Sequence, residues 1–339
     1  MRVLSLAAVA LAACLVSAPS AEQANPFLGA WNITGTGQDS AIIYWLEVKQ
    51  EAGGLTGMFL NRVGNPNPLG IVRVEGDELV FRMGTAERPN GPDYRAKIEN
   101  GRLIGRHTVT EGGGRGRGRG ADPNAPPPPP PTERTVNWIG VRPPEFPGAN
   151  ANAAHRYEAP VELFDGKSLD MWTTQFPNRP FGWKIEDGAM TNDHPADTPA
   201  ARNNLISKQK FMNFKLEAEY KLGPNSNSGI YIRGRYELQL LDDFIKSGRA
   251  DLGHMAIYGR TAPSVKASKP AGEWQTMTAI IHGNRATVTL NGQRVHDNQV
   301  ILGVTGGTLD ADEATPGPLM VQGDHSVVWI RKFTVTPIR

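Results

Sequence analysis

The sequence predicts an all-β protein with two domains, a larger C-terminal sandwich of antiparallel sheets and a smaller N-terminal antiparallel β-barrel or sandwich. Short runs in which apolar and polar residues alternate recur along most of the 339 residues, as expected of half-buried strands. Turn-forming dipeptides separate many of these runs, and 38 glycines and 27 prolines supply the turn chemistry. No long amphipathic helix interrupts the strands, and the chain is long enough for two domains that each bury a core.

The N-terminal residues have the pattern of an export signal. Arg2 supplies a positive charge, and the apolar run of residues 3–13 is too short to span a bilayer as a helix. Two processing routes remain open. Residues 11–14, LAAC, resemble a bacterial lipoprotein box that would leave Cys14 lipidated, whereas ordinary cleavage at the end of the segment is the alternative. We therefore expect a signal peptide over residues 1–21 and an extracytoplasmic location, either periplasmic, secreted or lipid-anchored.

Cysteine count and charge exclude several classes of protein. Cys14 is the only cysteine, so the mature protein has no internal disulfide and depends on its cores for stability. The net charge is +2 with acids and bases interspersed, which indicates no nucleic-acid or membrane-surface partner. No dinucleotide-binding fingerprint is present, so we expect no nucleotide cofactor. Exposed strand edges are compatible with a homo-oligomer but do not specify one.

Residues 25–142 form the predicted N-terminal β domain. Its expected strands cover residues 29–34, 41–50, 54–60, 71–76, 78–84, 94–100, 102–110 and 134–141. Their up-and-down spacing is lipocalin-like in outline, which is an analogy of fold alone. Residues 112–132 combine Gly, Arg and a proline run, so we expect a disordered insert with a polyproline II segment. Residues 143–159 form the expected linker, and we find no catalytic constellation in this domain.

The C-terminal domain, residues 160–339, repeats the strand pattern. Its expected strands cover residues 161–165, 182–190, 203–211, 213–222, 274–283, 285–295, 317–323 and 326–338. Asp187-Gly188 and Asn291-Gly292 are tight-turn signals, the second in a type I′ hairpin. The pattern predicts two packed antiparallel sheets, one convex and one lining a groove.

Residues 225–242 separate into two faces when they are read with a period of two. The apolar face carries Ile230, Ile232, Tyr236, Leu238 and Leu240. The other face carries Tyr231, Arg233, Arg235, Glu237 and Gln239. An aromatic ring, two guanidiniums, a carboxylate and an amide together suit a sugar-binding groove, and a solvated outer strand face is the alternative.

Seven motifs of this domain occur in a characteristic order. They are FDGKSLDMW, WKIEDGAM, FKLEAEYKL, NSNSGIYIRGRYELQLLD, AIYGRTAPSVKASKPAGEWQ, LNGQRV and GPLMVQGDHSVVWIRKFTV. Together they resemble the 3-keto-disaccharide hydrolase family, formerly a domain of unknown function. The resemblance covers about residues 160–339 and implies a concanavalin-like jelly-roll fold and a carbohydrate substrate.

The candidate site residues lie in three segments. They are Asn225, Ser228, Tyr231, Arg233, Glu237, Gln239 and Asp242 in the first, Tyr258, Lys266 and Trp274 in the second, and Gln322, Asp324 and His325 in the third. Each has a structural alternative: turn residues satisfy backbone groups, Arg233 and Glu237 can pair on a surface, and His325 can be a surface histidine. Because the family motifs are intact, we favour a site. We expect catalysis from His325, Glu237, Arg233 and Asp242, and substrate binding from the others.

The spacing of carboxylates disfavours ordinary glycosidase chemistry. Laminarinase-type jelly rolls carry Glu-x-Asp-x-x-Glu on one strand, where this chain has Glu237, Gln239 and Asp242. Gln239 cannot act as an acid, so the two-carboxylate mechanism is weakened. The family resemblance implies instead that a ketone at C3 acidifies the C2 proton, that a base removes it, that the enolate expels the leaving group from C1, and that water then adds.

Several roles follow from that implied reaction. His325 or Glu237 is the expected base, Arg233 stabilises the enolate, and Asp242 or Asp324 orients the imidazole. A divalent metal ion held by Glu237, Asp242, Asp324 or His325 is a further hypothesis. A separate sugar 3-dehydrogenase must supply the oxidised substrate. The alternatives are a non-catalytic, lectin-like carbohydrate-binding protein and a conventional glycoside hydrolase acting on unoxidised glycans.

Overall fold

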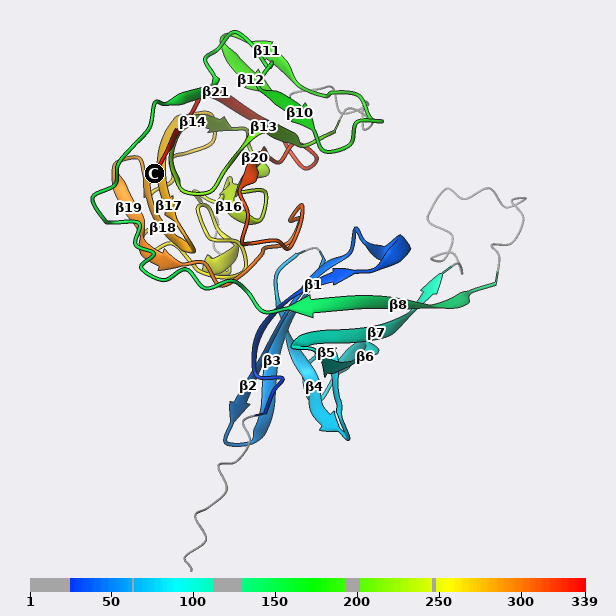
Figure 1. The fold of residues 1–339 in the computed structure, drawn as a ribbon. Coiled ribbons are helices and arrows are strands. Elements are labelled where there is room, and N and C mark those ends of the chain that lie inside the picture. The colour runs from blue at the N-terminus through cyan, green and yellow to red at the C-terminus, as the bar shows by residue number, and fades with distance from the viewer. Residues whose placement is uncertain (1–24, 63, 112–129, 193–201, 246–247) are drawn as a thin grey trace, which may run out of the picture.

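The computed structural model describes residues 25–62, 64–111, 130–192, 202–245 and 248–339. It confirms the all-β class, with a closed eight-stranded barrel followed by a two-sheet sandwich (Figure 1). The predicted signal peptide, Cys14 and most of the predicted insert lie outside the described residues, so those expectations stay predictions. In the part of the chain that is described, no helix combines the length and the apolar character needed to cross a membrane.

The barrel is an up-and-down meander. Its strands are β1 (Gly29–Gly35), β2 (Ile43–Glu51), β3 (Gly54–Asn61), β4 (Asn67–Glu75), β5 (Glu78–Gly84), β6 (Pro89–Glu99), β7 (Arg102–Glu111) and β8 (Thr132–Val141). Each strand pairs with the next, β8 closes on β1, and the short 3-10 helix η1 (Gly37–Asp39) follows β1. Aromatic rings fill the interior, namely Trp31, Tyr44, Phe59, Phe81, Tyr94 and Trp138. His107, an isolated histidine of the sequence, is buried there and stacks on Tyr94.

The sandwich consists of a five-stranded and an eight-stranded sheet. The smaller sheet has the order β10 (Trp172–Thr174), β13 (Leu205–Phe211), β20 (Gly317–Val321), β15 (Asn227–Ile232) and β16 (Tyr236–Leu241). The larger has the order β11 (Lys184–Glu186), β12 (Ala189–Thr191), β21 (Val328–Pro337), β14 (Phe214–Leu222), β17 (Trp274–His282), β18 (Arg285–Leu290) and β19 (Gln293–Val300), with β9 (Val161–Phe164) paired to β21. The one described helix of this domain is η3 (Ala250–Leu252), a 3-10 turn.

Both predicted tight turns are present. Asp187 and Gly188 have φ angles of 50° and 72°, and Asn291 and Gly292 have φ angles of 49° and 82°. A positive φ at both central residues is the mark of a type I′ turn, which suits the twist of the two strands that it joins. Each turn closes a two-residue hairpin, between β11 and β12 and between β18 and β19.

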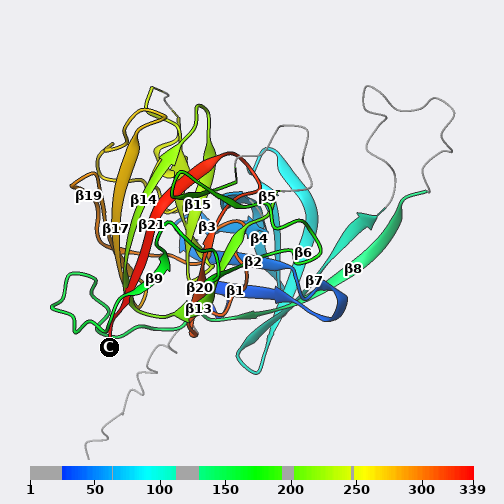
Figure 2. The same ribbon diagram turned by 90° about the horizontal axis from the view of Figure 1, so that it is seen from above.

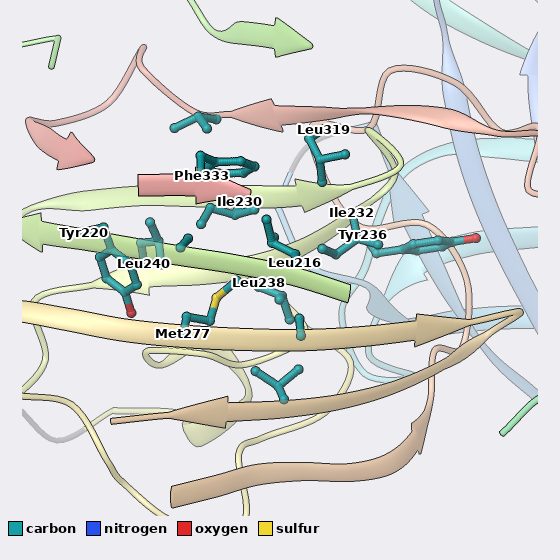
Figure 3. Packing of buried hydrophobic residues seen from close by; sticks show 14 of the residues in the cluster. Leu216, Tyr220, Ile230, Ile232, Tyr236, Leu238, Leu240, Met277, Leu319 and Phe333 are labelled. Atoms are coloured by element: carbon teal, nitrogen blue, oxygen red, sulfur yellow. The ribbon is translucent and has the colours of Figure 1, made fainter. Parts of the chain in front are cut away.

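The stretch 225–242 is a hairpin rather than one long strand. β15 ends at Ile232, Arg233 and Gly234 turn with φ angles of 54° and 69°, and β16 begins at Tyr236. The predicted apolar face is confirmed, because Ile230, Ile232, Tyr236, Leu238 and Leu240 all lie in the sandwich core. Figure 3 shows them between the two sheets, with Leu216, Tyr220 and Met277 from the opposite side.

The barrel packs directly on the sandwich, as Figures 1 and 2 show. Along β2, Tyr44 and Leu46 point into the barrel, whereas Ile43 and Trp45 point outward and join the sandwich core. The guanidinium of Arg260 lies 3.8 Å from the centre of the Trp45 ring. On the neighbouring strand β1, Asn32 Nδ2 donates a 2.6 Å hydrogen bond to Glu313 Oε1 of the sandwich. The interface therefore buries one face of the barrel and holds the two domains together.

Candidate active site

A cavity of about 500 Å³ lies where the hairpin, the β20–β21 turn and the barrel meet. Its volume is in the range of small-molecule sites. The lining residues are Ala41, Ile43, Arg62, Gly64, Gln175, Phe176, Asn204, Asn227, Tyr231, Glu237, Gln239, Tyr258, Gly306, Gly307, Thr308, Leu309, Gln322, Asp324 and His325. Seven of the predicted site residues are among them, from all three predicted segments: Tyr231, Glu237, Gln239, Tyr258, Gln322, Asp324 and His325.

Glu237 is the buried carboxylate of this cavity. Its partner across the hairpin is Tyr231, whose hydroxyl lies 2.9 Å from Glu237 Oε2. A Cβ at Gly229 would lie 2.3 Å from Glu237 Oε1, so a glycine is needed beside the carboxylate. The amide of Gln239, with its nitrogen facing the two acceptors around it, donates to Glu237 Oε1 at 3.1 Å and to the Ser228 carbonyl at 2.9 Å.

Burial changes the acidity of Glu237. Desolvation raises the pKa of its carboxyl from 4.5 to about 8, while the hydrogen bond from Tyr231 and the nearby His325 act in the opposite direction. The Tyr231 hydroxyl also lies 2.9 Å from the Gly306 carbonyl. Since a phenol has one proton, Tyr231 can donate to Glu237 when the carboxylate is charged and to Gly306 when the carboxyl is protonated. The site can therefore accommodate Glu237 both as a charged carboxylate and as a protonated carboxyl group.

His325 and Asp324 form a second titratable pair on the turn after β20. His325 Nδ1 lies 2.7 Å from Asp324 Oδ1. That hydrogen bond, together with the negative charges of Asp324 and Glu237, raises the pKa of His325 above its ordinary value of 6.5. The pocket thus contains a carboxyl group with a raised pKa and an imidazole that favours its protonated form, which is the equipment of acid–base catalysis.

Arg233 does not line the cavity, so its position does not support its predicted role in catalysis. The alternation of faces ends where β15 ends, and Arg233 occupies the turn. Its side chain is fully buried, and Nη2 donates to the Tyr236 hydroxyl at 3.2 Å and to the Gly283 carbonyl at 3.1 Å. Arg235, assigned to the same polar face, is also buried and pairs with Asp310 at 2.5 Å. Both guanidiniums serve the folded structure.

Asp242 and Asn225 are also outside the cavity. Asp242 Oδ2 accepts a 2.7 Å hydrogen bond from the Asn225 backbone N–H, which fixes the turn before β15. Asn225 has a φ of 58°, a conformation that asparagine tolerates in turns. The contacts of Asn225 therefore agree with the structural alternative, and the predicted catalytic role of Asp242 is not supported by its position.

Three further residues predicted to bind substrate have structural contacts instead. Ser228 is buried and its Oγ donates to the Gln322 carbonyl at 2.7 Å. Lys266 Nζ donates to the Asp243 carbonyl at 2.5 Å. Trp274 begins β17 in the other sheet, where the Arg331 guanidinium lies 4.3 Å from the centre of its ring. None of the three lines the cavity.

Several cavity residues were missed by the sequence analysis. Asn227 lies on the same strand face as Tyr231, a placement that the period of two already contained. Asn204 donates to Gln175 Oε1 at 2.7 Å and accepts from the Gly323 backbone N–H at 2.7 Å, so it supports the turn that carries His325. The barrel residues, among them Arg62, and the loop residues 306–309 had no motif that would indicate them.

Three of the four hypothesised metal ligands, Glu237, Asp324 and His325, line the cavity. Asp242 bonds the Asn225 backbone outside it. Within the described ranges, no group of three or more His, Cys, Asp or Glu side chains is arranged to hold a metal ion. We therefore derive no catalytic step through a metal.

Comparison with known proteins agrees with the resemblance in the sequence. The chain is 36% identical over 164 residues to a protein of Bacteroides thetaiotaomicron named 3-keto-disaccharide hydrolase, a match that spans 40% of this chain and 57% of that relative. Two solved structures from Parabacteroides distasonis, each named provisionally as a glycosyl hydrolase, are also similar. One has a TM-score of 0.45 at 25% identity over 52% of this chain and 82% of its own. The other has a TM-score of 0.42 at 23% identity over 53% of this chain and 100% of its own.

The family assignment depends on the C-terminal domain. A family described as the 3-keto-alpha-glucoside-1,2-lyase-like domain matches residues 159–336, more than half of the chain. The match contains every segment of the sandwich that contributes to the cavity, from Gln175 to His325. The chain therefore belongs to the 3-keto-alpha-glucoside-1,2-lyase-like family.

Proposed function

We propose that this protein is a carbohydrate-active enzyme that cleaves the glycosidic bond of 3-keto-glycosides by elimination and hydration. Glu237 is the base that removes the C2 proton, and protonated His325, oriented by Asp324, is the acid. The observation that carries the proposal is the buried carboxyl of Glu237 in the pocket, with its pKa raised to about 8. Family membership supports the same reaction class.

The pKa of Glu237 suits the proposed task. A C–H bond beside a ketone is a weak acid, so its removal benefits from a base stronger than an ordinary carboxylate, and the most effective pKa is near the working pH. A pKa of about 8 meets both conditions. The Tyr231 hydroxyl keeps a hydrogen bond available to the carboxylate before the proton moves.

The proposed reaction has two stages, elimination of the leaving group and hydration of the product. Glu237 takes the proton from C2, and the electron pair forms an enolate whose oxygen is the former C3 ketone oxygen. The enolate re-forms the ketone as the C1–O bond breaks, and the leaving oxygen takes a proton from His325. Water then adds at C1 of the resulting unsaturated ketone, C2 regains a proton from Glu237, and His325 takes a proton from the water. The products are the 3-keto sugar and the free leaving group.

A conventional two-carboxylate mechanism has less support from the geometry. Of the three positions in the laminarinase-type pattern, Glu237 and Gln239 line the cavity, but Asp242 does not. The other cavity carboxylate, Asp324, is hydrogen-bonded to His325. Two carboxyl groups flanking one bond are required for retaining or inverting hydrolysis, and the elimination route needs only one.

The proposed reaction also requires a cellular location and a source of the oxidised substrate. The N-terminal sequence favours export, so we propose an extracytoplasmic location, with lipidation of Cys14 as one processing route. The chemistry further requires a separate sugar 3-dehydrogenase to supply the ketone. Mass analysis of the mature N-terminus distinguishes a lipidated Cys14 from ordinary cleavage, and an unprocessed N-terminus in an exported form would contradict both.

The deciding experiment compares a glucoside with its 3-keto derivative, each with and without a chelator. We expect cleavage of the keto form alone, and slower turnover when C2 carries deuterium, because the C2–H bond breaks. Glu237→Gln should abolish turnover, while Glu186→Gln, at an exposed position, serves as the matched control.

Equal cleavage of the unoxidised glucoside would refute the elimination chemistry. Binding of both sugars without cleavage would indicate a lectin-like protein, and loss of activity with chelator would restore the metal hypothesis.

A further inference from the structure

The barrel holds a loop that forms part of the candidate active site. This loop, residues 301–316, joins β19 to β20 and lies between the two domains. Gly307 donates its backbone N–H to the Arg62 carbonyl of the barrel at 3.3 Å. A Cβ on Gly306 would lie 2.1 Å from the Gly64 carbonyl oxygen, so loop and barrel backbones are in direct contact.

On its other side, the same loop contacts the hairpin of β15 and β16, which carries Tyr231 and Glu237. Thr305 Oγ1 accepts a 2.9 Å hydrogen bond from the Glu237 backbone N–H, and the Gly306 carbonyl lies 2.9 Å from the Tyr231 hydroxyl. A Cβ on Gly307 would lie 2.6 Å from that hydroxyl. The barrel therefore forms a wall of the cavity through its contacts with this loop and through its own side chains.

Arg62 is the charged side chain on the barrel wall of the cavity. It is exposed, and within the described ranges its guanidinium has no ion pair or hydrogen bond in the structure. The acid at this end of the barrel, Asp39, is paired with Arg134 at 2.7 Å instead. A guanidinium that faces a cavity without a carboxylate partner is available to bind an anionic ligand group.

The two carboxylates in the cavity are already engaged. Glu237 accepts from Tyr231, and Asp324 is bonded to His325. The charged groups that shift the pKa of Glu237 are His325 and Asp324. Arg62 lines the cavity from the barrel, whereas Glu237 and His325 line it from the sandwich, so the barrel wall is the side toward which the part of the ligand beyond the reacting sugar would extend.

We propose that the barrel wall, formed by Ala41, Ile43, Arg62 and Gly64, is the leaving-group subsite, and that Arg62 selects leaving groups that carry a carboxylate. This inference rests on the proposed function. The planar guanidinium matches a carboxylate through two parallel N–H···O bonds, and the apolar side chains of Ala41 and Ile43 offer contact to the ring that carries it. Uronic acids and aromatic acids both have this chemistry.

The test uses two 3-keto-glucosides with the same aromatic leaving group, 4-hydroxybenzoate in one and its uncharged amide in the other. We expect wild type to prefer the carboxylate in kcat/KM by about 2- to 5-fold, as an ion pair at an exposed guanidinium can provide. Arg62→Gln should reduce the ratio to about 1. Arg102→Gln changes an exposed arginine of β7 outside the cavity and should keep the ratio. A wild type without preference, or an Arg62→Gln variant that retains it, would overturn the assignment.

A binding measurement separates this inference from the proposed reaction. Calorimetry with the two unoxidised glucosides reports the dissociation constants without any turnover. If neither keto substrate is cleaved but the carboxylate still binds tighter in wild type and not in Arg62→Gln, the elimination chemistry fails and the Arg62 subsite stands. If both keto substrates are cleaved at equal rates and both glucosides bind equally, the reaction stands and the subsite is refuted.

Discussion

Replacing Glu237 by glutamine should abolish activity and stabilise the protein at alkaline pH. Burial raises the pKa of this carboxyl from 4.5 to about 8 in the folded state. The folded protein binds this proton more tightly than the unfolded chain, so its contribution to stability is complete below about pH 4.5 and is lost as the pH rises through about 8. Each pKa unit corresponds to about 1.4 kcal/mol. Between about pH 5 and pH 8.5 the wild type should lose about 4 kcal/mol of unfolding free energy at this position.

Glutamine has nearly the same shape and does not ionise, so the variant avoids this loss. The assay is chemical denaturation of both proteins at about pH 5 and pH 8.5, and the measured quantity is the change in their stability difference between the two pH values. Groups that titrate alike in both proteins cancel in that difference, and Glu186→Gln gives the baseline for an exposed site. A stability difference that is constant across this range would mean that Glu237 has an ordinary pKa, and the argument for its strength as a base would fail.

Three other substitutions test the remaining parts of the site. Tyr231→Phe removes the hydrogen bond that favours the charged carboxylate, so the limb of the kcat/KM profile that reports Glu237 should move to higher pH by about one unit; an unchanged limb would contradict the contact. Asp324→Asn removes the group that raises the pKa of His325, so the limb that reports His325 should move to lower pH with the fold intact by circular dichroism. Arg233→Ala leaves the buried Gly283 carbonyl without its donor, so it should cost about 1–3 kcal/mol of stability in denaturation and leave KM of the surviving protein unchanged, and a selective rise in KM would return Arg233 to the site.

The apolar pattern was sufficient to predict the fold class. Alternating residues identified most strands, and Asp187-Gly188 and Asn291-Gly292 identified two hairpin turns, because these dipeptides adopt positive φ angles at low cost. The extent of β6 was underestimated, since it begins at Pro89 in a segment without an apolar alternation. Proline and polar residues weaken a strand signal, yet the neighbouring strand β5 supplies enough partners to extend the pairing.

Along the hairpin, site residues on one strand face were predicted correctly to line the cavity, because the period of two determines which residues share that face. Those in the turn and after the end of β16 were not. Tyr231, Glu237 and Gln239 share the cavity because they alternate along two paired strands. Arg233 was expected on the same strand face, but Arg233 and Gly234 form a turn. Arg-Gly is a weaker turn signal than Asn-Gly or Asp-Gly, so the sequence did not indicate this turn. Asp242 comes after the end of β16, and beyond a strand end the period of two no longer determines which way a side chain points.

The contribution of the barrel to the site had one signal in the sequence, in strand β2. Ile43, Tyr44, Trp45 and Leu46 are all apolar, whereas a strand with one wet face alternates. A continuous apolar run indicates a strand that is buried on both faces, and here the two faces belong to two cores, with Tyr44 inside the barrel and Trp45 in the sandwich. The docking that this run requires brings the end of β3, with Arg62, to the cavity. The barrel is thus bound to the sandwich by the same strand pair that supplies its part of the pocket, so substitutions that loosen Trp45 should alter the proposed leaving-group selection as well as stability.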